Sequence, residues 1–287
     1  MTDYGPLLEE VRRLRWRARG SLAGALPGAH PSRRRGTSAE FAEYRPYRQG
    51  DPLGRVDWKL FARTDRAYLR LSPDRTVLST MMVVDASASM DFPERDSKLE
   101  RARQLAVALA AVAHQEGDPA GVAVAGDRIS VYRPRTRGGV VGDIAHVLDA
   151  ARPGNAALLV EALGAALRAA RRVVWLSYML ADEQRLVGMM RAHVVRGSEA
   201  YVVHVMAAAE LEPAAGVVHD PESQHERRVL DPDGVERYSE NFFRWREELA
   251  TRCRAAGIAY AATRTDEAVG PDVRRIVALG GSRVAVR

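Results

Sequence analysis

The chain has 287 residues and a mass of 31.6 kDa, and 46% of its residues are hydrophobic while 28% are charged. This composition excludes a disordered, collagen-like or disulfide-framework protein, and the length suffices for one large domain or two small ones. The formal net charge of +6 is uneven, because residues 1–75 hold 16 Lys and Arg against 9 Asp and Glu, whereas the rest of the chain holds 27 against 28.

Nothing in the sequence predicts a membrane span or a secretory leader. No apolar run approaches the roughly 18 residues that a spanning helix needs. Asp3, Glu9 and Glu10 precede any apolar segment, which is not the basic-then-apolar order of a signal peptide. The single cysteine, Cys253, excludes an internal disulfide and a multi-cysteine zinc site. We therefore expect a cytoplasmic protein.

The N-terminal quarter is basic and shows little regular pattern. Residues 7–19 place apolar side chains on one broad face, which predicts a short basic amphipathic helix. Residues 20–38 are rich in Gly, Pro and Ser and contain three consecutive arginines, so they predict a loop. Between residues 37 and 74 we expect one strand, at 67–71. We assign residues 1–75 to an extension packed on a main domain of residues 76–287.

From residue 77 onward, strand patterns alternate with helix patterns. The predicted strands are 77–84, 121–125, 129–133, 172–177, 200–206 and 258–263. The predicted helices are 97–115, 140–151, 157–171, 182–196, 238–256 and 271–279. The second and third strands form a predicted hairpin with one antiparallel edge strand, and residues 211–236 predict a surface hairpin. The alternation predicts an α/β fold with a doubly wound, mainly parallel sheet.

A short polar motif follows the first buried strand of this domain. Residues 85–90 read Asp-Ala-Ser-Ala-Ser-Met, and ligands of such sheets bind at the carboxyl ends of the strands. The carboxylate of Asp85 and the hydroxyls of Ser87 and Ser89 are hard oxygen donors, which suit Mg²⁺ or Mn²⁺ and do not suit zinc. The alternative is a helix-capping turn, whose side chains bond backbone N–H groups.

Two motifs carry a resemblance to known families. The Asp-x-Ser-x-Ser sequence resembles the metal-ion-dependent adhesion site (MIDAS) of von Willebrand factor A domains. Upstream, the stretches RGTSAEF from Arg35, YRPYRQGDP from Tyr44 and RVDWK from Arg55 resemble the signature of the bacterial domain-of-unknown-function 58 family. The resemblance covers residue 30 to the end and implies an A-like fold. It also implies a protein-interaction role beside a MoxR-type AAA+ ATPase.

The sequence departs from that metal-site pattern in two loops. The family has Gly-Thr-Asp where this chain has Gly154-Asn155-Ala156, and a Ser-Asp pair where it has Ser177-Tyr178. Asn155 and Asp182 are possible substitutes if the loops shift. With one carboxylate left, we expect weak binding of a divalent cation, because charge count sets the affinity for hard cations.

The upstream signature allows two interpretations. Its polar and aromatic residues either form a partner surface or, as we favour here, a buried network that fastens the extension to the main domain, with the Trp58 ring packed inward. These residues are Arg35, Glu40, Asp51, Arg55, Asp57, Trp58 and Arg63.

We expect a non-enzymatic adaptor whose Asp85 site, with or near a divalent cation, binds an acidic residue of a partner. One alternative is a metal-dependent hydrolase that uses the same site, although the sequence offers no clear general base. A second is nucleic-acid binding through the arginine-rich N-terminus, for which a solvated basic face is the competing interpretation. His219 and His225 are expected to be surface side chains, and Cys253 a buried inert thiol.

Overall fold

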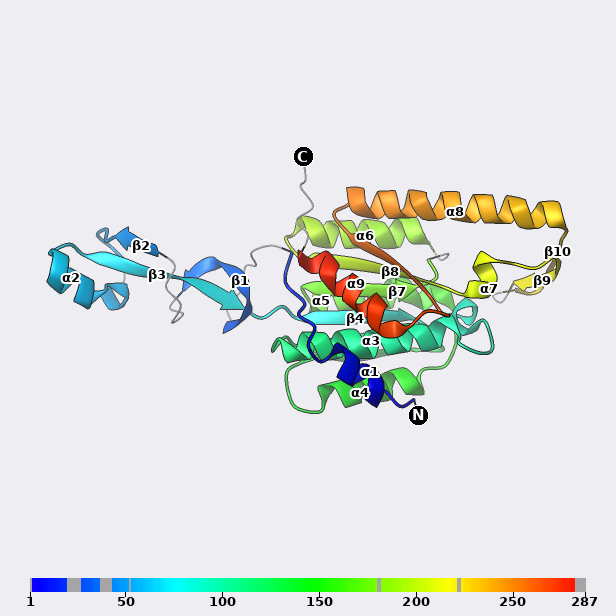
Figure 1. Cartoon of the computed structure of the whole chain (residues 1–287), viewed down its shortest axis with the longest axis horizontal. Helices are drawn as coiled ribbons and strands as arrows, with labels where there is room; N and C mark the ends of the chain where they lie inside the picture. Colours follow the sequence, from blue (N-terminus) through cyan, green and yellow to red (C-terminus); the bar gives the residue numbers. More distant parts are fainter. Residues whose placement is uncertain are drawn as a thin grey trace. The chain divides into compact units, whose positions relative to one another are not determined.

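The computed structural model describes residues 2–19, 27–36, 43–51, 53–179, 182–220 and 223–281. The chain divides into two compact units (Figure 1), and each is described by itself. The larger unit comprises Met1–Arg19 and Ser79–Arg287, and the smaller unit comprises Gly20–Leu78. The predicted boundary at residue 75 lies close to the end of the smaller unit, but the first 19 residues belong to the larger one. Packing of the extension on the main domain stays a prediction.

A six-stranded sheet forms the centre of the larger unit. Its strands lie in the order β11-β8-β7-β4-β5-β6, and all neighbours are parallel except β5 and β6. The bounds are β4 Thr80–Asp85, β5 Ala120–Ala125, β6 Ile129–Arg135, β7 Arg172–Ser177, β8 Glu199–Met206 and β11 Ala259–Arg264. The predicted fold class is confirmed, including the antiparallel edge pair.

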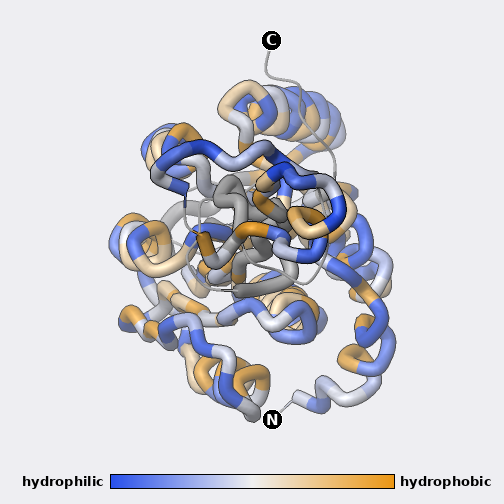
Figure 2. The backbone as a smooth tube through the Cα atoms, turned by 90° about the vertical axis from the view of Figure 1, so that its left-hand side faces the viewer, coloured by the Kyte–Doolittle hydropathy of each residue, from blue (hydrophilic) through white to orange (hydrophobic). Residues whose placement is uncertain are grey.

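Helices cover both faces of this sheet, because its central strands are apolar on both sides. Met82 and Val84 of β4 pack in one hydrophobic cluster with α1, α3, α4 and α9, whereas Met81 and Val83 pack in the other with α5, α6 and the C-terminal part of α8. The hydropathy of the chain alternates along the helices (Figure 2). The bounds are α1 Gly5–Val11, α3 Lys98–Gln115, α4 Val140–Ala150, α5 Leu159–Ala169, α6 Glu183–Val195, α8 Pro232–Ala255 and α9 Val269–Gly281.

The predicted start of α3 and the predicted surface hairpin are both present in the structure. The Ser97 hydroxyl accepts from the backbone N–H of Glu100 at 3.1 Å and so caps the start of α3. The predicted surface hairpin is also confirmed, since β9 and β10 pair antiparallel. The remaining elements of this unit are η2 Ala88–Asp91, η3 Ala156–Leu158, α7 Ala208–Leu211, β9 Gly216–Asp220 and β10 Ser223–Leu230.

The N-terminal helix is shorter than predicted. It ends at Val11, and the following residues run in a non-helical conformation against the larger unit. Trp16 is fully buried there, with the guanidinium of Arg172 lying 4.3 Å from its ring centroid. Arg172 also donates to the backbone carbonyls of Trp16 and Arg17, both at 3.3 Å. These tertiary contacts, and not helical hydrogen bonds, hold residues 16 and 17 of the non-helical segment.

The smaller unit has more regular structure than predicted. A three-stranded antiparallel sheet lies in the order β1-β3-β2, and a single helical turn plus a short helix connect β2 to β3. The predicted loop at 20–38 contains a strand, because its backbone pairs with distant residues of β3. The bounds are β1 Pro27–Gly36, β2 Glu43–Pro46, η1 Leu53–Arg55, α2 Trp58–Thr64 and β3 Tyr68–Thr76.

Candidate functional site

The candidate site begins at the carboxyl end of β4, where the strand order reverses. Asp85 is the last residue of this strand, and only 3% of its surface is exposed. One carboxylate oxygen accepts from the backbone N–H of Ser87 at 2.9 Å, and the other accepts from the Ser177 hydroxyl at 2.6 Å. Such a switch point is where doubly wound sheets place their ligand sites. The carboxylate is therefore held in one orientation by neighbours on both sides.

The two serines of the motif lie together beside Asp85. Their hydroxyl oxygens are 3.1 Å apart, and Ser87 is buried. Ser87 precedes η2 but makes no side-chain hydrogen bond that caps it. Of the three motif residues, Asp85 behaves as the capping interpretation predicts, because its carboxylate accepts from the Ser87 amide. Ser87 makes no such capping bond. The structure brings together Asp85, Ser87 and Ser89.

The second loop contacts this turn through its backbone. Gly154 forms a parallel bridge to Ser87, donates to the carbonyl of Ala86 at 2.8 Å and accepts from the amide of Ala88 at 3.0 Å. Asn155 is exposed, and its side-chain oxygen accepts from the Ala157 amide at 2.7 Å. Asn155 therefore caps η3, and its role as a metal ligand stays a prediction.

The third loop places an aromatic ring where the resemblance implies an aspartate. Ser177 ends β7 and bonds Asp85, and the next residue, Tyr178, is 7% exposed. Burial raises the pKa of Tyr178, so the phenol is neutral. Asp182 begins α6 in a left-handed conformation, is exposed, and lies 3.8 Å from the Arg185 guanidinium. A role for Asp182 at the metal site also stays a prediction.

A buried ammonium group that sequence analysis did not single out belongs to the same region. Lys98 is 1% exposed, and its Nζ forms an ion pair with Glu210 and lies 3.5 Å from the centroid of the Tyr178 ring. Burial lowers the pKa of Lys98, and the charges of Glu210 and Asp85 oppose that shift. One signal was available: lysine occupies two of the 43 Lys and Arg positions, so its use at residue 98 is unusual in this chain.

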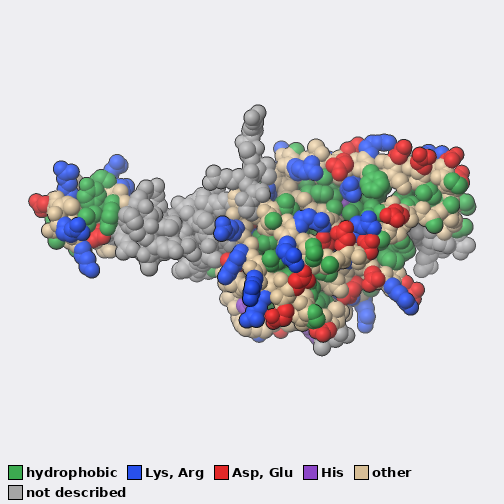
Figure 3. Space-filling model, in the orientation of Figure 1, with side chains coloured by type: hydrophobic (Ala, Val, Ile, Leu, Met, Phe, Trp, Pro, Cys, Tyr) green, Lys and Arg blue, Asp and Glu red, His purple; other side chains and the backbone are tan. Residues whose placement is uncertain are grey.

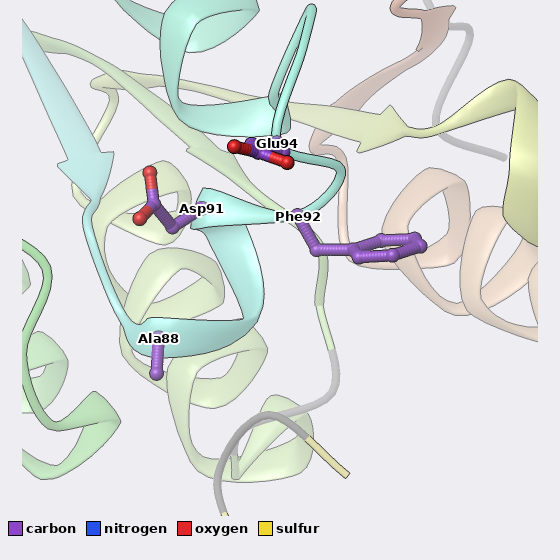
Figure 4. Close-up of a pocket in the computed structure, with 4 residues that line it drawn as sticks. All are labelled: Ala88, Asp91, Phe92 and Glu94. Atoms are coloured by element: carbon purple, nitrogen blue, oxygen red, sulfur yellow. The ribbon is translucent and has the colours of Figure 1, made fainter. Parts of the chain in front are cut away.

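An open pocket adjoins the turn and is acidic. It has a volume of about 360 Å³ and is lined by Ala88, Asp91, Phe92 and Glu94. In Figure 4 the Phe92 ring points away from Ala88 and Asp91. Among the described residues, no group of three or more His, Cys, Asp or Glu side chains is arranged to hold a metal ion.

As a donor set for a divalent cation, the site fits poorly. It offers the carboxylate of Asp85 and the hydroxyls of Ser87, Ser89 and Ser177, and a buried ammonium lies nearby, whereas hard cations take six or more oxygen ligands. The expectation of Mg²⁺ or Mn²⁺ stays a prediction.

Within the smaller unit, the described signature residues do not form a buried network, and their packing on the main domain stays a prediction. Trp58 is 58% exposed on α2, and none of the residues of that helix is buried. Asp57 caps the helix by accepting from the amides of Lys59 and Leu60, and its other oxygen accepts from the Tyr44 hydroxyl at 2.8 Å. The Trp58 ring packs edge-on against the ring of Phe61, with the two centroids 6.0 Å apart.

Of the remaining signature residues, the structure describes the side chains of Asp51 and Arg63. Asp51 accepts from the Arg45 guanidinium at 2.7 Å, which lowers the pKa of the carboxyl. Arg63 is exposed near the end of α2. Glu40 and the side chains of Arg35 and Arg55 lie outside the described part of the chain.

The remaining candidates were one cysteine and two histidines. Cys253 is buried in the second hydrophobic cluster, and this burial raises the pKa of its thiol to about 12, so it is unreactive. The side chains of His219 and His225 are outside the described part. No helix among the described residues has the length and apolar character required to span a bilayer.

The larger unit is thus a doubly wound α/β domain with an Asp-x-Ser-x-Ser turn at its switch point. The chain belongs to the family described as "Protein of unknown function DUF58", whose model matches residues 43–248. It is similar to uncharacterized proteins of Mycobacterium bovis and Mycobacterium tuberculosis, each 27% identical over 96% of this chain and 90% of the relative.

Two solved structures are also similar to this chain. The conserved hypothetical protein BatB from Bacteroides thetaiotaomicron is 14% identical, with a TM-score of 0.47 over 71% of this chain and 98% of that protein. A von Willebrand factor type A structure from Catenulispora acidiphila is also 14% identical, with a TM-score of 0.40 over 72% of this chain and 43% of that one.

Proposed function

We propose that this protein is a non-enzymatic, cytoplasmic adaptor that binds an acidic segment of a partner protein through the smaller unit. The observation that carries the proposal is the exposure of Trp58, at 58% of its surface. Tryptophan is enriched among the residues that dominate binding energy at interfaces, because a large rigid ring loses little entropy when it is covered. An outward Trp58 therefore favours the partner-surface interpretation of the family signature.

The neighbours of Trp58 define the chemistry of the partner. We call Tyr44, Trp58, Lys59 and Arg63 the α2 surface, since Tyr44 is bonded to the cap of that helix and the others lie on it. Lys59 and Arg63 are one helical turn apart and exposed, and no ion pair involves them within the described residues. Figure 3 shows hydrophobic side chains flanked by basic ones on the described part of this unit. Such a surface complements carboxylates beside an apolar side chain.

The family resemblance supplies the partner class. We propose a MoxR-type AAA+ ATPase, as the resemblance implies, with this protein linking the ATPase to a third protein. The burial of Asp85 supports a role without catalysis, because only 3% of its surface is exposed and its carboxylate oxygens are directed at the Ser87 amide and the Ser177 hydroxyl. A general base needs a lone pair directed at substrate.

The test is a binding titration between the full-length protein and a purified MoxR-type ATPase from the same organism. We expect Trp58→Ala to weaken binding by about thirtyfold, the effect of losing about 2 kcal/mol at an interface centre. Arg63→Glu should also weaken binding and flatten its dependence on salt.

Matched controls come from the larger unit. Phe243 and Arg244 are also an exposed aromatic and an exposed arginine, on α8. Phe243→Ala and Arg244→Glu should bind the ATPase as the wild type does. Equal affinity of Trp58→Ala and Phe243→Ala would overturn the role of the α2 surface. Binding of a single-stranded oligonucleotide that Trp58→Ala abolishes would instead favour nucleic-acid binding, and metal-dependent turnover of phosphodiester or peptide substrates would favour a hydrolase.

A further inference from the structure

The environment of Lys98 is that of an internal counter-ion. Its ammonium group is almost completely removed from water, yet it has three electron-rich neighbours. Nζ pairs with Glu210, lies 3.5 Å from the Tyr178 ring centroid and lies 5.8 Å from the Phe92 ring centroid. Burial of an ammonium group without such partners would lower the stability of the fold by several kcal/mol. The carboxylate and the two rings offset this cost.

These partners connect Lys98 to the Asp85 turn. Tyr178 directly follows Ser177, whose hydroxyl donates to Asp85 at 2.6 Å. The charge of Asp85 also raises the pKa of Lys98, against the effect of burial. Glu210 is itself fixed, since its second oxygen accepts from the Ala207 amide at 3.0 Å after β8. One positive charge thus lies among elements that follow β4, β7 and β8.

The same arrangement opposes a divalent cation. A cation bound to Asp85 would lie near a fixed ammonium inside a region of low dielectric constant, where like charges repel strongly. The position from which the family draws its third-loop carboxylate carries the Tyr178 ring instead, and that ring already covers Lys98.

From this geometry we infer that the Lys98 ammonium, held by Glu210 and covered by Tyr178, provides the positive charge at the Asp85 turn in place of a divalent cation. The turn is therefore folded and rigid in the absence of metal. This inference is independent of the proposed partner surface, because every residue that carries it lies in the larger unit.

The first experiment titrates the full-length, chelator-stripped protein with Mn²⁺ and Mg²⁺. Calorimetry and the electron paramagnetic resonance signal of free Mn²⁺ report binding. We expect no saturable site for either cation at millimolar concentration, and no change in melting temperature between chelator and Mg²⁺. A site in the wild type that Asp85→Ala abolishes would overturn the inference.

The second experiment restores the carboxylate and removes the ammonium. The double variant Lys98→Met, Tyr178→Asp should gain Mn²⁺ binding, and its melting temperature should then rise with added Mn²⁺. Retention of Lys98 in the single variant Tyr178→Asp should leave Mn²⁺ binding at least tenfold weaker. Equal Mn²⁺ affinity of these two variants would contradict an opposing role of Lys98.

The chain provides a matched control for loss of a lysine. Lys59 is the other lysine and is exposed, so Lys59→Met makes the same chemical change without removing a buried charge. Lys98→Met should lower the melting temperature and Lys59→Met should not. If both variants melt as the wild type does, Lys98 has no counter-ion role. If Lys98→Met does not fold, the Mn²⁺ titration of the wild type still decides the question.

Discussion

At the scale of single residues, the larger unit keeps several titratable groups in an apolar environment. His204 on β8 is fully buried among the rings of Tyr178, Phe242, Trp245 and Tyr260. Its Nδ1 lies 2.9 Å from the Tyr260 hydroxyl oxygen. Burial, and then the charges of Arg246 and Lys98, lower the pKa of His204 from 6.5 to about 3. The folded protein therefore keeps this imidazole neutral over a range in which the unfolded chain protonates it.

That difference predicts the sign of the pH dependence. Between pH 6.5 and about 3 the unfolded chain binds more protons at this position, so the free energy of unfolding falls as the pH is lowered through this range. We expect His204→Gln to reduce that fall, by at most about 1.4 kcal/mol per pH unit. Urea unfolding at pH 7.5, 6.0 and 5.0 measures it, and the exposed His146→Gln is the control. A wild-type slope in His204→Gln would contradict the burial of a neutral imidazole.

At the scale of elements, three loops approach one another closely at the candidate site. Gly154, in the loop after α4, has no room for a side chain, because an added Cβ would overlap with the backbone of Gly126 and Asp127. Its backbone also bridges to Ser87. The position of the second loop thus depends on glycine, whereas Gly142 of α4 has open space around it.

Substitution by alanine should change the free energy of unfolding in opposite directions at Gly154 and Gly142. Gly154→Ala should lower the free energy of unfolding by about 1–3 kcal/mol or more, because the backbones must separate. Gly142→Ala should raise it by about 0.5–1 kcal/mol, because alanine is the better helix former and meets no neighbour. Urea unfolding of both variants checks the pair, and a stable Gly154→Ala protein would show that the loops are not in contact.

The elements of the larger unit were largely predictable, whereas the strands of the smaller unit and the buried neighbours of the site were not. Strands such as β4 and the Ser97 cap of α3 depend on patterns within a few residues. The strand β1 depends on pairing with β3, and the burial of Trp16 involves Arg172, 156 residues away in the sequence. The ion pair of Lys98 and Glu210 joins residues 112 apart, so no local pattern indicates it. The Asp-x-Ser-x-Ser turn was predictable because one motif contains all its oxygen donors.

At the scale of the whole molecule, the four tryptophans differ in their exposure to solvent. Trp16 and Trp175 are fully buried and Trp245 is half-buried, whereas Trp58 is 58% exposed. Acrylamide should therefore quench Trp58 most efficiently. We expect Trp58→Phe to lower the fluorescence quenching constant more than Trp245→Phe does, because Trp58 is the more exposed emitter. A quenching constant unchanged in Trp58→Phe would instead support the predicted packing of the extension on the main domain.

The division of the chain makes the smaller unit an insertion with two covalent attachments. It leaves the larger unit after Arg19 and rejoins it at Ser79, next to the central strand β4. The amide of Arg19 donates to Glu199, and Arg172 binds the carbonyls of Trp16 and Arg17. A force applied to the smaller unit would therefore load both attachments together. The resulting tension would pass into β7, β8 and β4, so mechanical force applied at the α2 surface would be borne by the sheet that carries the Asp85 turn.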